Sequence, residues 1–308
     1  MTGIFKALCG LLLALTCSFS FSQTISLTFD DGLDPDRQRD AAAWNREILA
    51  GLKEADVKAM VFPALVRIGG EAGLDLIREW AAQGHAVGNH TAGHRSLASP
   101  QVSLEDFISD VGKADAVLSR LPRWKPMLRF PYLKEGDTAA KRDGMRAWMQ
   151  AHGYRTAAVS IDASDWYYNQ VFSALAERGS TQKARQVEDA YIDHLLDRAA
   201  YYDQLARQVL GYSPPHVMLL HTSRINAAAV PRIIRAFRAR GWTFVSPLEA
   251  FEDPVYSTQP DTLPAGESII WASAKARGVQ GLRYPAEDSV YEEPGLKAQG
   301  LLPQGMAK

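Results

Sequence analysis

Cysteine is almost absent from this chain of 308 residues, and both cysteines, Cys9 and Cys17, stand near its beginning. The rest of the chain therefore has no cysteine nucleophile, no thiolate metal site and no disulfide of its own. Any metal ion bound there must be held by histidine, aspartate or glutamate side chains. A chain of this length can still bury enough apolar surface to be stable without cross-links.

An excess of charge of either sign is also lacking, since the formal net charge is −1. This balance argues against a surface that binds a polyanion, and we expect no nucleic acid partner. Hydrophobic residues make up 46% of the chain and charged residues 22%, so a large core is expected and global disorder is excluded. The sequence contains no internal repeat and no low-complexity segment.

The apolar run nearest the N-terminus, residues 7–15, is too short to span a bilayer. It follows Lys6 and precedes small residues, an order typical of a secretory signal peptide. We therefore expect a signal peptide over residues 1–22, cleaved before Gln23, and a secreted or periplasmic protein without a membrane span in its mature form. An uncleaved anchor and lipoprotein processing at Cys17 are the alternatives.

Short apolar stretches alternate with helical patterns up to about residue 250. Seven stretches have the composition and length of strands: 24–29, 58–64, 85–90, 125–132, 154–162, 216–221 and 242–246. Such alternation predicts parallel strands joined by right-handed crossovers. We expect a closed or nearly closed β/α barrel, with an open doubly wound sheet as the alternative.

Two regions depart from this alternation. Residues 170–211 have apolar side chains at helical spacing, which predicts an amphipathic helical insert packed on the barrel. The alternative is that the insert forms one wall of a binding groove. Turn residues prevail from Pro254 onward, and we interpret residues 254–308 as a non-catalytic C-terminal extension that packs on the barrel or is partly mobile.

Polar side chains recur where the predicted strands end. The set comprises Asp30, Asp31, His90, Arg129, Asp162 and His221. Because the carboxyl ends of parallel strands face the same side, and ligands bind there in both barrels and open sheets, this recurrence indicates a functional site.

The segment HTAGH places His90 and His94 four residues apart, where one helical turn would point both toward one metal ion. Such a pair alone is often incidental, and an Asp-Asp-Gly turn after a strand is common. A strand-end carboxylate supplies a third ligand, and two histidines with one carboxylate leave positions open for water. The adjacent Asp30 and Asp31 repel each other unless they differ in role. One would bind the cation and the other would take a proton from bound water.

Five segments in order resemble the NodB-homology polysaccharide deacetylases, carbohydrate esterase family four. They are TFDDG (28–32), HTAGH (90–94), RFPY (129–132), DASDW (162–166) and LLH (219–221). The resemblance covers about residues 24–250. It implies a distorted (β/α)7 barrel of the NodB type, with residues 23–253 as the catalytic domain.

The resemblance also implies a metal centre and its proton acceptor. Asp30 would be the general base, while Asp31, His90 and His94 would bind one divalent metal ion, which is zinc in most family members. Arg129 would hold Asp30 by an ion pair.

The remaining motif residues are implied to serve the leaving group and the substrate. Asp165 would orient and charge His221, the general acid. Tyr132 would offer its backbone N–H to the oxyanion, and Trp166 and Leu219 would wall the acetyl pocket. From the residues alone, Asp165 can also cap a helix with Asp162, and His221 can be an ordinary core histidine.

The expected activity is metal-dependent hydrolysis of N-acetyl groups on amino-sugar glycans, such as peptidoglycan, chitin-like polymers or poly-N-acetylglucosamine. The acetylated glycan is the expected partner. The alternative within the enzyme class is an O-acetyl esterase acting on acetylated xylan or a similar polymer. The alternative of another class is a catalytically inactive glycan-binding protein. The glycan, the native metal and the oligomeric state do not follow from the sequence.

Overall fold

The computed structural model describes residues 23–283, 285, 289–303 and 305. The predicted signal peptide, residues 1–22, lies outside these residues. Within them, no helix combines the length and the apolar character that a membrane span requires.

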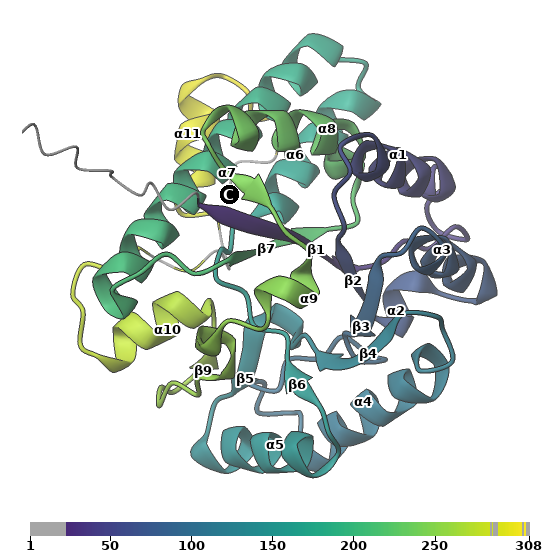
Figure 1. Cartoon of the computed structure of the whole chain (residues 1–308). Coiled ribbons are helices and arrows are strands. Elements are labelled where there is room, and N and C mark those ends of the chain that lie inside the picture. Colours follow the sequence, from purple (N-terminus) through teal and green to yellow (C-terminus); the bar gives the residue numbers. More distant parts are fainter. Residues whose placement is uncertain (1–22, 284, 286–288, 304, 306–308) are drawn as a thin grey trace, which may run out of the picture.

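A curled, seven-stranded parallel sheet forms the centre of the described chain (Figure 1). Its strands are β1 (Thr24–Asp31), β2 (Met60–Pro63), β3 (Ala86–Asn89), β4 (Trp124–Leu128), β6 (Arg155–Thr156), β7 (His216–His221) and β8 (Thr243–Phe244). The order is β6-β4-β3-β2-β1-β7, and β8 pairs with the start of β1. All seven strands were predicted at these places in the sequence.

The segment that follows β6 bridges the two edges of the sheet. It leaves β4, with which β6 pairs, and reaches β7, where Ile161 pairs with Met218. The N–H groups of Ser160 and Ile161 both donate to the carbonyl oxygen of Val217 at 3.0 Å. This bridging confirms the predicted distorted barrel over the open sheet. It also explains why the fifth predicted strand, 154–162, is regular only at its first residues, since its remainder crosses between neighbours.

Helices cover the outside of the curled sheet (Figure 1). They are α1 (Ala41–Glu54), α2 (Leu65–Ile68), α3 (Glu71–Ala82), α4 (Leu104–Leu118), α5 (Ala139–Ala151), α6 (Asp165–Glu177), α7 (Thr181–Leu210), α8 (Arg224–Ala239) and α9 (Pro247–Ala250). Ser103, Thr138 and Ser223 begin α4, α5 and α8, each accepting the N–H of the residue three positions later. Such caps stabilise a helix by about 1 kcal/mol each.

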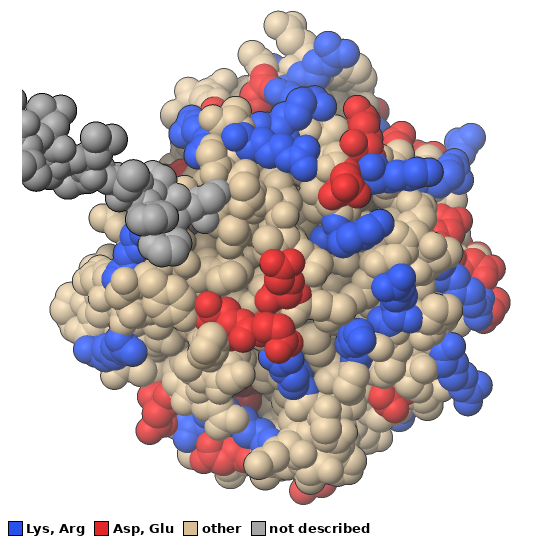
Figure 2. Space-filling view, in the orientation of Figure 1, with Lys and Arg blue, Asp and Glu red and all other residues tan. Residues whose placement is uncertain are grey.

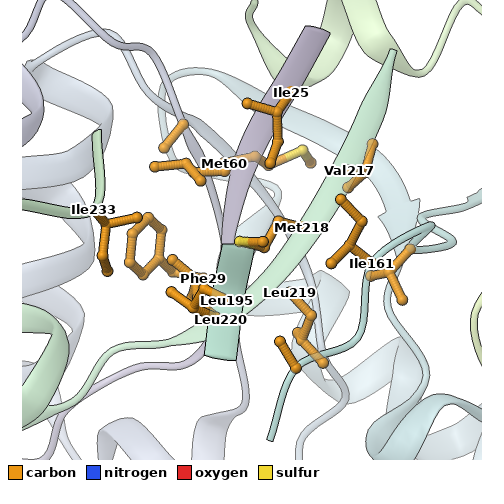
Figure 3. Close-up of a cluster of buried hydrophobic side chains, with 14 of the residues drawn as sticks. Ile25, Phe29, Met60, Ile161, Leu195, Val217, Met218, Leu219, Leu220 and Ile233 are labelled. Carbon is orange, nitrogen blue, oxygen red and sulfur yellow. The ribbon is translucent and has the colours of Figure 1, made fainter. Parts of the chain in front are cut away.

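The adjacent strands β1 and β7 carry much of the core (Figure 3). Ile25, Leu27 and Phe29 alternate along β1 and are fully buried, as their spacing predicts. Between them, the hydroxyl of Thr28 donates to the carbonyl oxygen of Met218 at 2.8 Å. β1 is therefore buried on both faces, and this fixes the position of the residues at its carboxyl end.

The predicted helical insert consists of α6 and α7, separated at Gly179, whose φ of +71° ends the first helix. The predicted apolar stripe of α7 is buried: Val187, Tyr191, Leu195, Tyr202, Leu205 and Val209. The insert is thus an amphipathic helix packed on the barrel, as its spacing predicts.

The chain after Pro254 packs on the barrel. It forms η2 (Pro254–Ser257), β9 (Ala265–Gly266), α10 (Ile269–Ala276) and α11 (Glu292–Ala298), and β9 pairs with β5 (Lys134–Gly136) in a small antiparallel sheet. The N–H of Ile269 donates to the carbonyl oxygen of Val159 at 2.7 Å. Helices α10 and α11 were not predicted, because each is short and lies among turn residues.

The buried hydroxyl of Ser160 joins the bridging segment to its surroundings. It accepts the N–H of Val217 at 2.8 Å, and it lies 3.0 Å from Nδ1 of His216 and 3.2 Å from the hydroxyl oxygen of Tyr256. Tyr256 also lies 2.7 Å from the carbonyl oxygen of Pro215. The segment after residue 254 therefore supports the closure of the barrel.

Replacing Tyr256 by phenylalanine tests this support. We expect Tyr256→Phe to lower the free energy of unfolding by about 1–3 kcal/mol, because the carbonyl oxygen of Pro215 loses its donor and Ser160 loses a buried hydroxyl partner. The control is Tyr212→Phe, which removes a hydroxyl bonded to Asp253 at the surface and should change that free energy by less than about 0.5 kcal/mol. Denaturant unfolding measures the free energy of unfolding of both variants. Equal losses would show that the buried Tyr256 hydroxyl stabilises the fold no more than the surface hydroxyl of Tyr212.

Candidate active site

The carboxyl ends of neighbouring strands bring the predicted residues onto one face of the barrel. Asp30 and Asp31 end β1, and His221 ends β7 directly beside Asp30 in the strand register. His90 follows β3, and Arg129 follows β4.

The backbone turns sharply between the two aspartates. Asp31 has a φ of +78°, and the N–H of Gly32 donates to the carbonyl oxygen of Asp30 at 3.1 Å. This is the hydrogen bond and the central φ of a γ-turn, which is rare and strained for a residue with a side chain. Because Asp31 lies at its centre, the two carboxylates leave the strand toward different partners.

Asp31 meets the two histidines of the HTAGH segment. One ligand atom from each of Asp31, His90 and His94 lies within 4.8 Å of the others, and no other such group of three occurs among the described residues. Oδ1 of Asp31 is 3.2 Å from Nε2 of His94 and 3.9 Å from Nε2 of His90. This oxygen is buried, yet it accepts no hydrogen bond from any residue that the structure describes.

The two imidazoles are arranged to offer lone pairs. Nδ1 of His90 lies 2.7 Å from the carbonyl oxygen of Arg129, which can only accept, so Nδ1 carries the proton and Nε2 is free to act as a ligand. Burial lowers the pKa of His90 well below its usual value, and burial also lowers the pKa of His94. Two neutral imidazoles facing a buried carboxylate oxygen without a donor fit a divalent cation.

The HTAGH segment forms a loop, so the predicted helical turn is wrong. Thr91 and His94 both have positive φ, +68° and +51°. Side chains replace helical hydrogen bonds: Asn89 accepts the N–H of Thr91 at 2.8 Å, and Thr91 accepts that of His94 at 3.0 Å. The N–H of Gly93 donates to Asp110 at 2.8 Å. The four-residue spacing still brings the rings to 4.8 Å, but through this loop.

Asp30 is held by Arg129 in a buried ion pair. Nη1 of Arg129 lies 2.9 and 3.1 Å from the two carboxylate oxygens of Asp30. The guanidinium is itself fixed by hydrogen bonds to Thr28 and to the carbonyl oxygen of Ala157, and it lies 4.6 Å from the ring centre of Phe62. Thr28 lies in the TFDDG segment, but neither Thr28 nor Phe62 was predicted to support this pair.

Burial raises the pKa of Asp30 to about 6, although Arg129 acts in the opposite direction. Asp31 is less buried, with 21% of its side chain exposed. A further cation, the half-exposed Arg67, lies at this rim with Nε 3.7 Å from Oδ1 of Asp31. The two adjacent carboxylates therefore occupy different environments, as a division of roles requires.

Asp165 and His221 form the second close pair. Oδ1 of Asp165 lies 2.6 Å from Nδ1 of His221, and Oδ2 accepts the backbone N–H of His221 at 2.6 Å. Burial acts to lower the pKa of His221, but the Asp165 carboxylate outweighs it, and with Asp31 and Asp30 it raises that pKa to about 10. Ser164 occupies the N-cap position of α6 without a capping hydrogen bond from its side chain, and Asp165 is the first helical residue, so the alternative in which Asp165 is the N-cap is wrong.

The predicted substrate contacts lie around these pairs. Tyr132, in the short helix η1 (Pro131–Leu133), is 57% exposed, and its ring packs 4.8 Å from that of His94. Trp166 is partly buried beside Asp165, and Leu219 is buried in β7. Asp162 is buried, and its carbonyl oxygen accepts a hydrogen bond from Arg198.

Known proteins with similar sequences include deacetylases. Residues 21–156 match the family model described as polysaccharide deacetylase. A peptidoglycan-N-acetylglucosamine deacetylase of Bacillus cereus is 26% identical over 234 residues, which are 74% of this chain and 71% of that protein. A chitin deacetylase of Colletotrichum lindemuthianum is 28% identical over 152 residues, covering 47% of this chain and 54% of that protein.

Solved structures show the same fold. The Bc1960 peptidoglycan N-acetylglucosamine deacetylase is 23% identical, with a TM-score of 0.51 over 74% of this chain and 88% of that one. The peptidoglycan deacetylase PdaC from Bacillus subtilis is 19% identical, with a TM-score of 0.50 over 75% of this chain and 91% of that one. The family match, the relatives and the curled parallel sheet agree, and residues 21–156 of this chain match the polysaccharide deacetylase domain of the NodB type.

Proposed function

We propose that this deacetylase is a metal-dependent hydrolase that removes N-acetyl groups from amino-sugar glycans such as peptidoglycan or chitin-like polymers. The observation that carries the proposal is the grouping of Asp31, His90 and His94 beside two charged pairs, Asp30–Arg129 and Asp165–His221. The predicted signal peptide supports action outside the cytoplasm, in the periplasm or after secretion.

Asp31, His90 and His94 would hold the divalent ion, most simply zinc given two imidazoles and one carboxylate. When bound, such an ion polarises the acetyl carbonyl and makes water acidic enough to attack near neutral pH. Asp30 is the neighbouring carboxylate that takes the proton from this water. Arg129 keeps both oxygens of Asp30 in place, because its own guanidinium is locked by buried partners.

His221 serves the leaving group on the opposite side. A sugar amine is a very poor leaving group unless it is protonated as the carbon–nitrogen bond breaks. With its pKa raised to about 10 by Asp165, against the effect of burial, His221 is cationic at neutral pH and can give that proton. This requirement favours N-acetyl over O-acetyl substrates, since an alkoxide leaving group depends less on a strong acid partner.

The substrate contacts complete the proposal. The backbone N–H of Tyr132 would donate to the oxyanion, a contact commonly worth about 3–4 kcal/mol in the transition state. Trp166 and Leu219 would flank the acetyl methyl group. Charged side chains of both signs are dispersed over the face in Figure 2, in keeping with the formal net charge of −1. Residues 23–253 would form the catalytic domain, and the contacts of the following segment with the barrel give it a structural role.

Metal dependence is tested by removing one ligand. We expect His90→Ala to lose stoichiometric zinc, and acetate release from N-acetylglucosamine oligosaccharides to fall at least about 100-fold, because two ligands hold the ion poorly. His152→Ala, at an exposed position after α5, should retain both. Elemental analysis and acetate release are measured on the same samples. Undiminished turnover by chelated, zinc-free wild-type protein would refute metal dependence, and zinc binding without any acetate release would favour the glycan-binding alternative.

The base is tested by Asp30→Asn. This change should lower kcat by about 100- to 10,000-fold, the usual contribution of a general base, while zinc remains bound. Asp40→Asn is the matched control, because Asp40 is exposed and its side chain does not cap α1. Near wild-type turnover of zinc-loaded Asp30→Asn would show that another group takes the proton.

The acid is tested by the pH dependence of kcat/KM on an amide substrate. A general acid is active at pH values below its pKa. In the wild type, kcat/KM should therefore decline only at alkaline pH, as the raised pKa of His221 implies. Asp165→Asn removes the carboxylate that raises the pKa of His221, so burial then lowers that pKa. The decline should then move to lower pH by about one unit or more. An unmoved decline would exclude His221 as the titrating acid.

A further inference from the structure

Two buried side chains outside the five motifs contact the Asp165–His221 pair. The amide nitrogen of Asn226 donates to Oδ2 of Asp165 and to the backbone carbonyl oxygen of His221, both at 2.8 Å. The hydroxyl of Tyr191 lies 2.7 Å from the amide oxygen of Asn226. Tyr191 and Asn226 are both 0% exposed.

The chemistry of these partners allows one orientation of the Asn226 amide. A carboxylate and a carbonyl can only accept hydrogen bonds. The amide nitrogen must therefore face them, and it donates one hydrogen bond to each. The amide oxygen then accepts the proton of the Tyr191 hydroxyl. All three contacts of the amide are hydrogen bonds of good length in a buried site, where a lost partner is costly.

The four side chains come from four different elements. Asp165 is the first residue of α6, Tyr191 lies within α7, His221 ends β7, and Asn226 lies in the first turn of α8. Helices α6, α7 and α8 contact one another and lie together on one side of the barrel (Figure 1). Tyr191 of the helical insert thus contacts the Asp165–His221 pair through Asn226.

The consequence for Asp165 is a fixed rotation of its carboxylate. Oδ2 accepts two hydrogen bonds, from the backbone N–H of His221 and from Asn226. Oδ1 is thereby left to face Nδ1 of His221 at 2.6 Å. Because Nδ1 is engaged, Nε2 is the ring nitrogen that can carry a proton to the substrate.

We propose that Asn226 and Tyr191 are positioning residues for the general acid, which act by holding the Asp165 carboxylate in line with His221. The inference rests on the proposed function, because it assigns His221 the transfer of a proton to the leaving amine.

Charged groups other than Asp165 also act on His221. His221 faces the carboxylates of Asp30 and Asp31 from β1 as well as Asp165 from α6, and the rings of His90 and His94 act on it from the loop after β3. An imidazolium released from Asp165 would lose the carboxylate that raises its pKa and fixes its orientation. Asn226 and Tyr191 prevent this release.

The test compares an amide with an activated ester. Zinc-loaded full-length wild type, Tyr191→Phe and Asn226→Ala are assayed on N-acetylchitotetraose and on 4-nitrophenyl acetate, whose leaving group needs no proton. On the amide we expect kcat to fall about 3- to 10-fold for Tyr191→Phe and about 10- to 100-fold for Asn226→Ala, with KM unchanged. On the ester both variants should stay within about two-fold of wild type.

Matched controls separate positioning from general loosening. Tyr202→Phe removes another buried hydroxyl from α7, one bonded to Arg198. Asn45→Ala removes another buried amide, one bonded to Trp80. These variants should affect amide and ester turnover by the same factor.

A double-mutant cycle decides the route of action. In an Asp165→Asn background no carboxylate remains to be held, so Tyr191→Phe or Asn226→Ala should change amide turnover by less than about two-fold further. Effects that multiply with Asp165→Asn, or equal losses on amide and ester, would overturn the inference. Should Asn226→Ala fail to fold, Tyr191→Phe decides in the same cycle. Failure of the proposed function is distinguishable, because the wild type itself would then release no acetate.

Discussion

The site depends on how two adjacent carboxylates are kept apart at the end of a buried strand. The positive φ of Asp31 and the hydrogen bond from Gly32 to Asp30 turn the chain between them. Asp30 pairs with Arg129 at 2.9 Å, and Asp31 lies 3.2 Å from His94, while Nε2 of His90 lies between them, 3.7 Å from Asp30 and 3.9 Å from Asp31. If both carboxylates shared one environment, their repulsion would raise the pKa of one of them without giving either a separate task. The strained turn assigns each carboxylate its partner, and the two-sided burial of β1 keeps that turn in place.

The division extends across the neighbouring strands. Arg129 follows β4 and supports Asp30, while His221 ends β7 and lies beside Asp30 in the register. The proposed proton acceptor, Asp30, and the proposed proton donor, His221, thus stand on adjacent strand ends, each paired with an opposite charge from another element. Arg129 and Asp165 are both almost fully buried, so each pair acts in a medium where a charge is stabilised mainly by its partner.

Much of this arrangement follows from sequence, because strand ends are local features. Apolar alternation predicts the strands, and parallel strands direct Asp30, His90 and His221 to one face. The conformation of the HTAGH loop does not follow, since Asn89 and Asp110 replace the helical hydrogen bonds through contacts that only the folded chain makes. The short regular part of the fifth strand likewise reflects a crossing from β4 to β7.

The supports of the charged pairs were hidden for a related reason. Asn226 and Tyr191 are 35 residues apart, and Asn226 lies 61 residues beyond Asp165. In the sequence each is an ordinary member of a helix, and only tertiary packing gives them a common partner. The short helices after Pro254 were missed because packing on the barrel, rather than helix propensity, stabilises them.

The central claim is that Asp31 binds the ion and Asp30 does not. Anomalous diffraction at the zinc edge from crystals of active, zinc-loaded protein tests it directly. The account predicts one peak at about 2.0–2.2 Å from an oxygen of Asp31 and from Nε2 of both His90 and His94, with Asp30 outside bonding distance and still paired with Arg129. A peak ligated by Asp30, or an ion held elsewhere while these three side chains remain free, would contradict it.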